Sequence, residues 1–98
     1  MAPPPRPTLA TVRERLGGGF RLSDGRTLLA PRPVGQREVL IGSWISVDGW
    51  PCEVTNMLWR PGGGRILHVN VDGTTAVLPV QSFETVEKYT VFTTPARR

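Results

Sequence analysis

Few side chains in this 98-residue chain could do chemistry, and their setting argues against catalysis. His68 is the only histidine and lies between two apolar residues, Leu67 and Val69. A serine nucleophile needs a nearby base, and a metal site needs several donors. Since no such partners stand near His68, we interpret it as a half-exposed residue of a strand. We expect no enzyme activity, no catalytic residue, no metal site and no cofactor.

The other reactive side chains also have structural explanations. Asp48 and Asp72 each precede a glycine, as aspartates do in turns where the carboxylate bonds to the local backbone. The glycines at 62–64 neither open a long helix nor precede Lys-Ser or Lys-Thr, so they predict a flexible hairpin loop rather than a phosphate loop. Cys52 is the only cysteine and lies in an apolar run. It predicts a buried, inert thiol and excludes an internal disulfide.

Aromatic side chains make a stronger case for binding than for catalysis. The chain has more aromatic residues after position 43 than the interior of a small domain can hold, so some should be exposed. Trp44 and Trp50 flank one turn and should be neighbours, whereas Trp59 lies at the far end of the strand that begins at Trp50. The alternative is that Trp44 caps the core and Trp50 shields the turn. The predicted partner-binding residues are Trp44, Trp50, Trp59 and Tyr89.

The charges are unevenly distributed along the chain. Residues 1–38 carry a net charge of +4, residues 39–92 carry −2, and residues 93–98 carry +2. Eleven arginines against one lysine suit phosphate recognition, but they also suit the codon usage of a GC-rich genome. The alternative function is therefore nucleic-acid binding by basic arms. Its candidate residues are Arg13, Arg15, Arg21, Arg26, Arg32, Arg37, Arg60 and Arg65.

Residues 39–92 should position these side chains on a small all-β domain. β-prone runs alternate there with tight turns, and two of those turns are Asp-Gly pairs typical of type I′ hairpins. In the long run 50–60, Cys52 and Val54 share one phase, whereas Met57 and Trp59 share the other. This change of phase predicts a bulge that curls the sheet. Pro79 should end its strand, followed by a 3₁₀ turn and a closing strand over 86–92.

The first 38 residues predict a basic arm rich in proline and glycine. Residues 1–7 (MAPPPRP) favour an extended, solvated chain. Residues 9–16 have helical spacing of apolar side chains and end at three glycines, which predicts a short helix. Residues 20–29 predict a hairpin that turns at Asp24-Gly25, and residues 30–38 predict a linker. The remaining residues, 93–98, form a basic tail.

The strand pattern over residues 42–92 resembles a five-stranded SH3-like barrel. The segment 47–54 resembles the first hairpin of KOW-type and elongation-factor-P N-terminal barrels, because an apolar strand turns at Asp-Gly into a Pro-x-Glu-Val step. The pattern DG-x-P-x-x-V-T followed by GGG-R-x-L is also similar to small actinobacterial and actinophage proteins. KOW-type barrels that contact RNA carry basic residues around the first turn and the following loop. Here that loop is flanked only by Arg60 and Arg65.

The resemblance implies a non-catalytic interaction module that docks a protein partner, in a regulatory or accessory role in an actinobacterium or phage. The module could use exposed aromatic residues or associate with itself through an open sheet edge. The first thirty residues lack the apolar core of a signal peptide, and no stretch approaches eighteen apolar residues. We therefore expect a cytoplasmic protein without membrane association. The sequence leaves the oligomeric state open.

Overall fold

The computed structural model describes residues 11–93, which form an all-β fold as predicted. Eight antiparallel strands make one curled sheet, and one 3₁₀ turn, η1 (Gln36–Glu38), connects two of them. Within residues 11–93 no helix is long and apolar enough to cross a membrane. The strands are β1 (Val12–Arg15), β2 (Phe20–Leu22), β3 (Thr27–Val34), β4 (Trp44–Val47), β5 (Trp50–Trp59), β6 (Arg65–Val71), β7 (Thr74–Val80) and β8 (Val86–Phe92).

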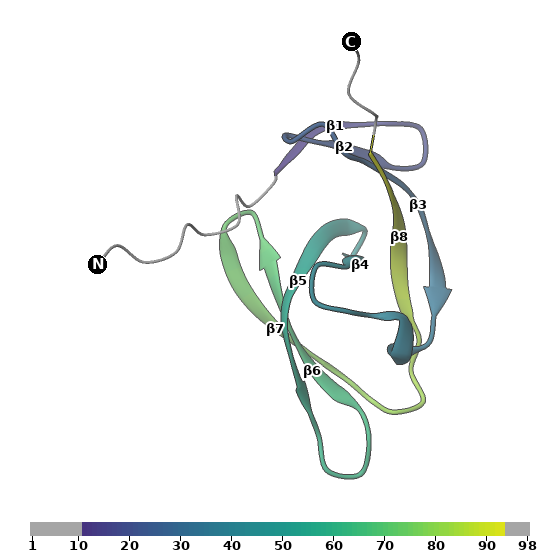
Figure 1. Ribbon diagram of the computed structural model, residues 1–98, viewed down its shortest axis with the longest axis vertical. Coiled ribbons are helices and arrows are strands. Elements are labelled where there is room, and N and C mark those ends of the chain that lie inside the picture. Colours follow the sequence, from purple (N-terminus) through teal and green to yellow (C-terminus); the bar gives the residue numbers. More distant parts are fainter. Residues whose placement is uncertain (1–10, 94–98) are drawn as a thin grey trace, which may run out of the picture.

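The strand order in the sheet is β1-β2-β3-β8-β4-β5-β6-β7. Strands β4 to β7 follow one another as a meander, and β8 then returns to lie between β3 and β4. Figure 1 shows the sheet curling into a half-barrel, with β1 and β2 lying across one end of it. The two outermost strands, β1 and β7, are both edges of the sheet. The curl follows from the right-handed twist of strands together with the irregular pairings described below.

The two predicted Asp-Gly turns are confirmed. Asp48 and Asp72 have positive φ angles of 52° and 51°, and the glycines that follow have φ angles of 81° and 89°. Positive φ at both central residues is the type I′ geometry whose twist matches the flanking strands. The side chain that bonds to the second turn is not the predicted one, since the Gly73 N–H donates to Asn70 Oδ1 at 2.9 Å.

The predicted change of phase in β5 is a bulge. The pairing register between β5 and β6 shifts between Val54 and Asn56, which leaves Thr55 as the extra residue. Before the bulge, Cys52 and Val54 are buried in the core; after it, Met57 packs against the same core from the opposite phase. The bulge therefore keeps apolar side chains on the inner face of the sheet where strict alternation would have turned them outward.

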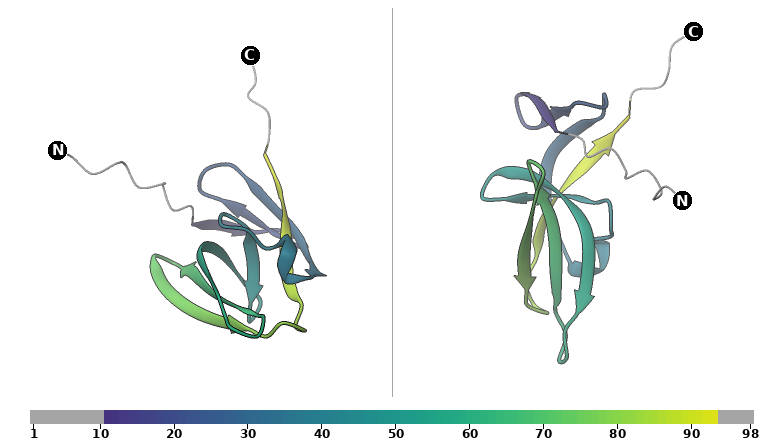
Figure 2. Two further views of the ribbon diagram at one scale, coloured as in Figure 1. Left: turned by 60° about the horizontal axis from the view of Figure 1, so that its bottom comes forward. Right: turned by 90° about the vertical axis from the view of Figure 1, so that its left-hand side faces the viewer.

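Two hydrophobic clusters hold the sheet together. The barrel cluster fills the inside of the curl and consists of Val34, Val39, Ile45, Cys52, Val54, Leu67, Val69, Val80 and Val86. The cap cluster consists of Phe20, Leu22, Leu28, Trp44 and Tyr89. Trp44 and Ile45 are adjacent in β4 and therefore point to opposite faces of the sheet. The two clusters thus lie on opposite sides of β4, and the β1–β2 hairpin covers the outer side (Figure 2).

The N-terminal segment departs from its sequence prediction. The helix predicted over 9–16 is wrong, because residues 12–15 form β1 and pair with β2; residues 9 and 10 lie outside the described part. Eight residues cannot sustain an isolated helix, whereas pairing with β2 gives the main chain of β1 hydrogen-bond partners. The hairpin over 20–29 is present as β2 and β3.

Two proline-containing segments also extend further as strands than predicted. The linker predicted over 30–38 begins as strand, since β3 continues to Val34 and pairs with β8 through a register shift between Leu29 and Arg32. Strand β7 likewise continues through Pro79 to Val80. Beyond Leu28 of β3, and along all of β7, only one neighbouring strand is present among residues 11–93. Proline is tolerated at such edges because its missing N–H can face away from the ladder.

Candidate functional site

The strongest candidate site is a groove that opens where β4 and β8 separate. These two strands pair at one position, Ile45 with Lys88. Before β4 the chain turns away toward β5, because the Ser43 N–H donates to Leu40 O at 2.9 Å and the Gly42 N–H donates to Val54 O at 2.7 Å. The main chain of residues 89–92 therefore has β3 on one side and, among residues 11–93, no strand on the other.

This β4–β8 groove has a volume of about 470 Å³ and an apolar lining. Trp44 and Tyr89 are buried and belong to the cap cluster, so the part of the groove they line is fixed by packing. Leu40 and Ile41, by contrast, are 59% and 61% exposed at the turn before β4. Adjacent large aliphatic side chains with this exposure beside a groove are typical of a docking surface.

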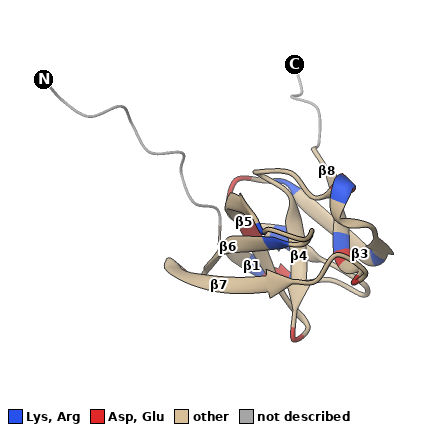
Figure 3. Ribbon diagram, turned by 90° about the horizontal axis from the view of Figure 1, so that it is seen from below, with Lys and Arg blue, Asp and Glu red and all other residues tan. Residues whose placement is uncertain are grey.

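The charged residues of the groove are mainly basic. Arg32 and Lys88 line it from the neighbouring strands β3 and β8. Both contact Glu38: the Arg32 guanidinium lies 3.7 Å from its carboxylate, and Lys88 Nζ donates to its main-chain oxygen at 2.6 Å. Figure 3 shows basic positions on β3 and β8 close together. With more than half of each side chain exposed, the Arg32–Glu38 pair is weak and can exchange partners.

Two indole N–H groups near this region have no hydrogen-bond partner among the described residues. They are Nε1 of Trp44 and Nε1 of Trp50, and both atoms are buried. Phe20 packs edge-on against Trp50, with ring centroids 5.7 Å apart, and the Arg26 guanidinium lies 5.9 Å from the Trp44 ring. A buried unpaired donor costs about 1–3 kcal/mol, so the cap cluster holds these indoles at the expense of some stability.

The structure brings together only part of the predicted aromatic surface. Trp44 and Tyr89 are 2% and 3% exposed and lie in one cluster, so only the portion that lines the groove can meet a ligand. Trp50 is half-buried and packs against both clusters. A position for Trp44 at the core was the alternative interpretation of the sequence. It missed Phe20, Leu22 and Leu28, which cover the aromatic face from the N-terminal segment.

Trp59 is the exposed member of the predicted set and lies apart from the groove. Its side chain is 73% exposed at the end of β5, directly opposite Arg65 of β6. The Arg65 guanidinium lies 4.1 Å from the Trp59 ring centroid and donates to the carbonyls of Gln36 and Val39 at 2.6 and 3.3 Å. Arg65 therefore fixes the turn around η1 from a buried position, and its guanidinium is not free for a phosphate.

Several predicted nucleic-acid contacts are likewise engaged within the chain. Arg21 pairs with Glu14 at 3.5 Å, Arg26 pairs with Asp24 at 2.7 Å, and Arg15 lies over the Phe20 ring at 5.3 Å. Arg13 and Arg37 are exposed, and Arg60 is half-buried. The basic positions are thus scattered over β1, β2, β3, β6 and three connecting segments, not gathered on one element.

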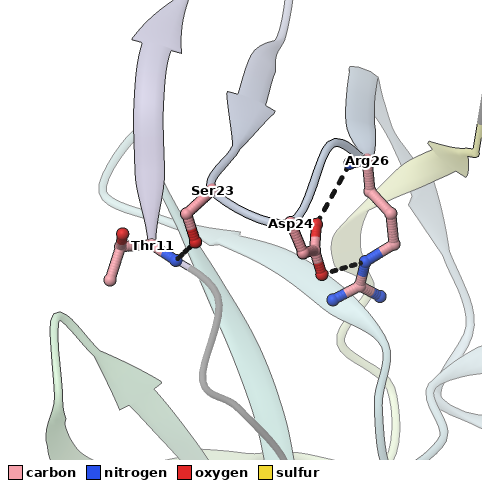
Figure 4. A network of polar contacts seen from close by, with 4 residues as sticks. All are labelled: Thr11, Ser23, Asp24 and Arg26. Carbon is pink, nitrogen blue, oxygen red and sulfur yellow. Dashed lines mark hydrogen bonds and ion pairs between the residues drawn. The ribbon is translucent and has the colours of Figure 1, made fainter.

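The Asp24–Arg26 pair belongs to a polar network at the end of the N-terminal hairpin (Figure 4). The Arg26 N–H donates to Asp24 Oδ1 at 3.0 Å, and the Thr11 N–H donates to Ser23 Oγ at 3.0 Å. Burial alone would raise the pKa of Asp24, but the hydrogen bonds from Arg26 outweigh it and hold that pKa below its ordinary value. The network closes the β2–β3 turn and ties the start of β1 to it.

The remaining titratable groups offer little for catalysis. Burial raises the pKa of the Glu53 carboxyl, with Arg26 opposing and Asp24 adding to the shift. Burial also raises the pKa of the Cys52 thiol, which disfavours the reactive thiolate. His68 is half-buried in β6, as predicted. Over residues 11–93 no group of three or more His, Cys, Asp and Glu side chains is placed to hold a metal ion.

Several groove residues were missed by sequence reasoning, namely Leu40, Ile41, Lys88 and Val91. The available signal was weak: Leu40 and Ile41 follow an apolar residue directly and precede Gly42, outside the alternating pattern of β4. Comparison with family models, with curated proteins and with solved structures finds no match to this chain.

Proposed function

We propose that this protein is a non-catalytic interaction module and that the β4–β8 groove binds an extended segment of a protein partner. The observation that carries the proposal is that the exposed side chains of Leu40 and Ile41 lie at a groove. The same groove is also lined by Trp44 and Tyr89. Burying aliphatic side chains of this exposure is favourable by roughly 25 cal/mol for each Å² removed from water.

The shape and charge of the groove support an extended, partly acidic ligand. Beyond the Ile45–Lys88 pair, residues 89–92 of β8 have no strand partner on the side facing the groove among residues 11–93, so a segment lying along them could add main-chain hydrogen bonds. Arg32 and Lys88 would attract a carboxylate on that segment. The preferred ligand is therefore an extended peptide with an aliphatic or aromatic side chain near an acidic one.

We also propose that β4 to β8 correspond to the five strands of the SH3-like barrel suggested by the sequence. Their order in the sheet is β8-β4-β5-β6-β7, in which the last strand returns to the first. The bulged β5 bends this set, as the long second strand of the resemblance requires. The N-terminal strands are then an addition to one edge of the barrel, and they cover its outer aromatic face.

The proposal can be tested with peptides selected from a displayed random library against the full chain. A selected peptide should shift the backbone NMR signals of residues 40–44 and 88–91. Ile41→Asp should weaken its binding by about tenfold, equivalent to about 1.4 kcal/mol, because a carboxylate replaces an exposed aliphatic contact and repels an acidic ligand. Leu58→Asp is the matched control, since Leu58 is an exposed aliphatic residue of β5 outside the groove.

The alternative of nucleic-acid binding is distinguished by adding a mixed-sequence single-stranded oligonucleotide. Binding of the oligonucleotide that falls steeply with salt and survives Ile41→Asp would favour the basic arms over the groove. Peptide binding that moves signals elsewhere, or that Leu58→Asp weakens as much as Ile41→Asp does, would overturn the assignment of the groove.

A further inference from the structure

The two edges of the sheet differ in how well they are protected. Strand β1 reads Val-Arg-Glu-Arg, and its pairing with β2 is irregular between Val12 and Glu14. Charge and bulges at an edge oppose pairing with another chain. Strand β7 reads Thr-Thr-Ala-Val-Leu-Pro-Val and has no charged residue, as Figure 3 shows along its whole length. The β7 edge therefore lacks the charge protection that β1 has.

The pairing of β7 with β6 determines which main-chain groups face outward. Val71 and Thr74 flank the two-residue turn, and the flanking pair of such a hairpin exchanges both hydrogen bonds. Since bonded and non-bonded positions alternate along the strand, Thr74, Ala76 and Leu78 bond to β6. The N–H and C=O groups of Thr75 and Val77 then point away from β6, toward the free edge.

Pro79 belongs to the same outward-facing series as Thr75 and Val77. Its missing N–H therefore costs the β6–β7 ladder no hydrogen bond, which explains how β7 continues through it to Val80. It also ends the outward row of donors, so the free edge offers donors at Thr75 and Val77 only. Proline here limits the length of any added pairing without blocking it.

We infer that β7 pairs in solution with β7 of a second copy of this chain, antiparallel about a two-fold axis at Ala76. Under this symmetry Thr75 of each copy meets Val77 of the other, and each pair exchanges both main-chain hydrogen bonds. The edge is therefore complementary to itself, and no like charges meet despite the net charge of +4. Val77, 60% exposed, would gain a cross-strand contact with the β-branched Thr75 of the partner.

The inference is independent of the β4–β8 groove, because β7 and the groove lie on different strands. A pairing of this length buries little surface, so the dimer should be weak and its population should rise with concentration. Sedimentation velocity of the full chain over a wide concentration range should show a reversible monomer–dimer equilibrium. Over the same range, hydrogen exchange of the Thr75 and Val77 amides should slow as the dimer forms.

Three variants make the test specific to the β7 edge. Val77→Pro removes an outward donor without removing a β6 bond and should abolish the dimer. Val77→Lys places like charges near the two-fold axis and should do the same without any change in backbone. Pro79→Thr restores an outward N–H and should tighten association by about tenfold, equivalent to about 1.4 kcal/mol. Circular dichroism should show the same strand content in all three.

Measurements on the unaltered chain can overturn the inference in two ways. One is a protein that stays monomeric, with fast exchange at Thr75 and Val77, at every concentration. The other is protection of these two amides at the lowest concentration, because another segment of the same chain would then cover the edge. Association that both Val77 variants leave unchanged would place the dimer contact elsewhere and would equally contradict the β7 pairing.

Discussion

The barrel cluster and the cap cluster share strands β3, β4 and β8 but otherwise draw on different parts of the sequence. The barrel cluster draws mainly on neighbouring strands of a meander, where alternating residues such as Leu67 and Val69 point inward. The cap cluster joins residues far apart in the chain, with Leu22 and Leu28 from the N-terminal hairpin packing against Trp44 and Tyr89. Strand β4 is thus buried on both faces, although it belongs to a small curled sheet.

The comparison shows that the N-terminal strands cover the aromatic face of the curled sheet from within the same chain. Phe20 packs edge-on against Tyr89, with ring centroids 5.9 Å apart, as a partner's aromatic residue would. The cap cluster has fewer buried residues than the barrel cluster, and the buried Trp44 Nε1 has no partner among the described residues. Local opening should therefore require less free energy at β1 and β2 than at β5 and β6.

The largest expected effect comes from truncating one buried leucine in each cluster. Leu67 and Leu22 are both 1% exposed, so Leu67→Ala and Leu22→Ala remove the same buried atoms. Leu67→Ala should lower the free energy of unfolding by about 2–5 kcal/mol, because the surrounding strands cannot collapse into the cavity. Leu22→Ala should cost about 2 kcal/mol, at the low end of that range, because the short β1–β2 hairpin can shift to fill part of the space.

Urea unfolding measures both costs, and native-state hydrogen exchange locates them. Leu22→Ala should accelerate exchange in β1 and β2 while β5 and β6 stay protected, whereas Leu67→Ala should accelerate exchange in all of them. Equal acceleration in β5 and β6 by both variants would mean that the two clusters open as one cooperative unit.

A smaller effect is expected from a methyl group placed at the turn between β1 and β2. An added Cβ at Gly19 would lie 1.8 Å from the main-chain oxygen of Leu28, and that oxygen cannot move without disturbing β3. Gly19→Ala should therefore cost about 1–3 kcal/mol and weaken the cap cluster specifically. The measurements are the urea midpoint and the near-ultraviolet circular dichroism of the tryptophans.

Gly17→Ala is the matched control in the same glycine run. No heavy atom lies within 4 Å of an added Cβ at Gly17, so this variant should stay within about 0.5 kcal/mol of the wild type. A Gly19→Ala protein as stable as the Gly17→Ala protein would show that the hairpin can move off Leu28 at no cost. The close docking of the cap would then be contradicted.

The sequence was most informative where the causes of structure are local. The turns at Asp48-Gly49 and Asp72-Gly73 depend on positive φ at adjacent residues, which few residue types tolerate. The bulge near Thr55 was visible because apolar side chains change phase across it. By contrast, the apolar spacing over residues 9–16 fits a helix, and only the pairing with β2 makes residues 12–15 a strand.

The candidate site was less predictable, because burial of an aromatic side chain depends on distant segments. Tyr89 and Trp44 were predicted to bind a partner because a small interior holds few aromatic side chains, with a core position for Trp44 as the alternative. Phe20 and Leu28 cover it across long stretches of chain. The groove itself arises where residues 40–43 turn toward β5. Main-chain hydrogen bonds to the oxygens of Leu40 and Val54 fix this turn, and no pattern of residue types predicts them.

The smallest expected effect concerns charge at the edge of the cap. Because hydrogen bonds from Arg26 hold the pKa of Asp24 below its ordinary 3.8, the folded state favours the carboxylate. This stabilisation is complete above pH 3.8 and is lost as the pH falls through the lower folded pKa. Since the pair is partly exposed, Asp24→Asn should cost less than about 1 kcal/mol near neutral pH and nothing at the acid limit.

The contribution of Glu53 to stability should depend on pH with the opposite sign to that of Asp24. Burial raises its pKa above the ordinary 4.5, so ionisation costs stability as the pH rises from 4.5 through the folded value. Thermal unfolding should be measured between about pH 2 and pH 7. As the pH rises, the stability of Asp24→Asn should fall relative to the wild type, and the stability of Glu53→Gln should rise relative to it. Arg26 lowers the pKa of both carboxyls, although burial is the main cause of the Glu53 shift, so both curves depend in part on this one guanidinium. Curves that run parallel to that of the wild type would mean that these carboxyls titrate alike in the folded and unfolded chains.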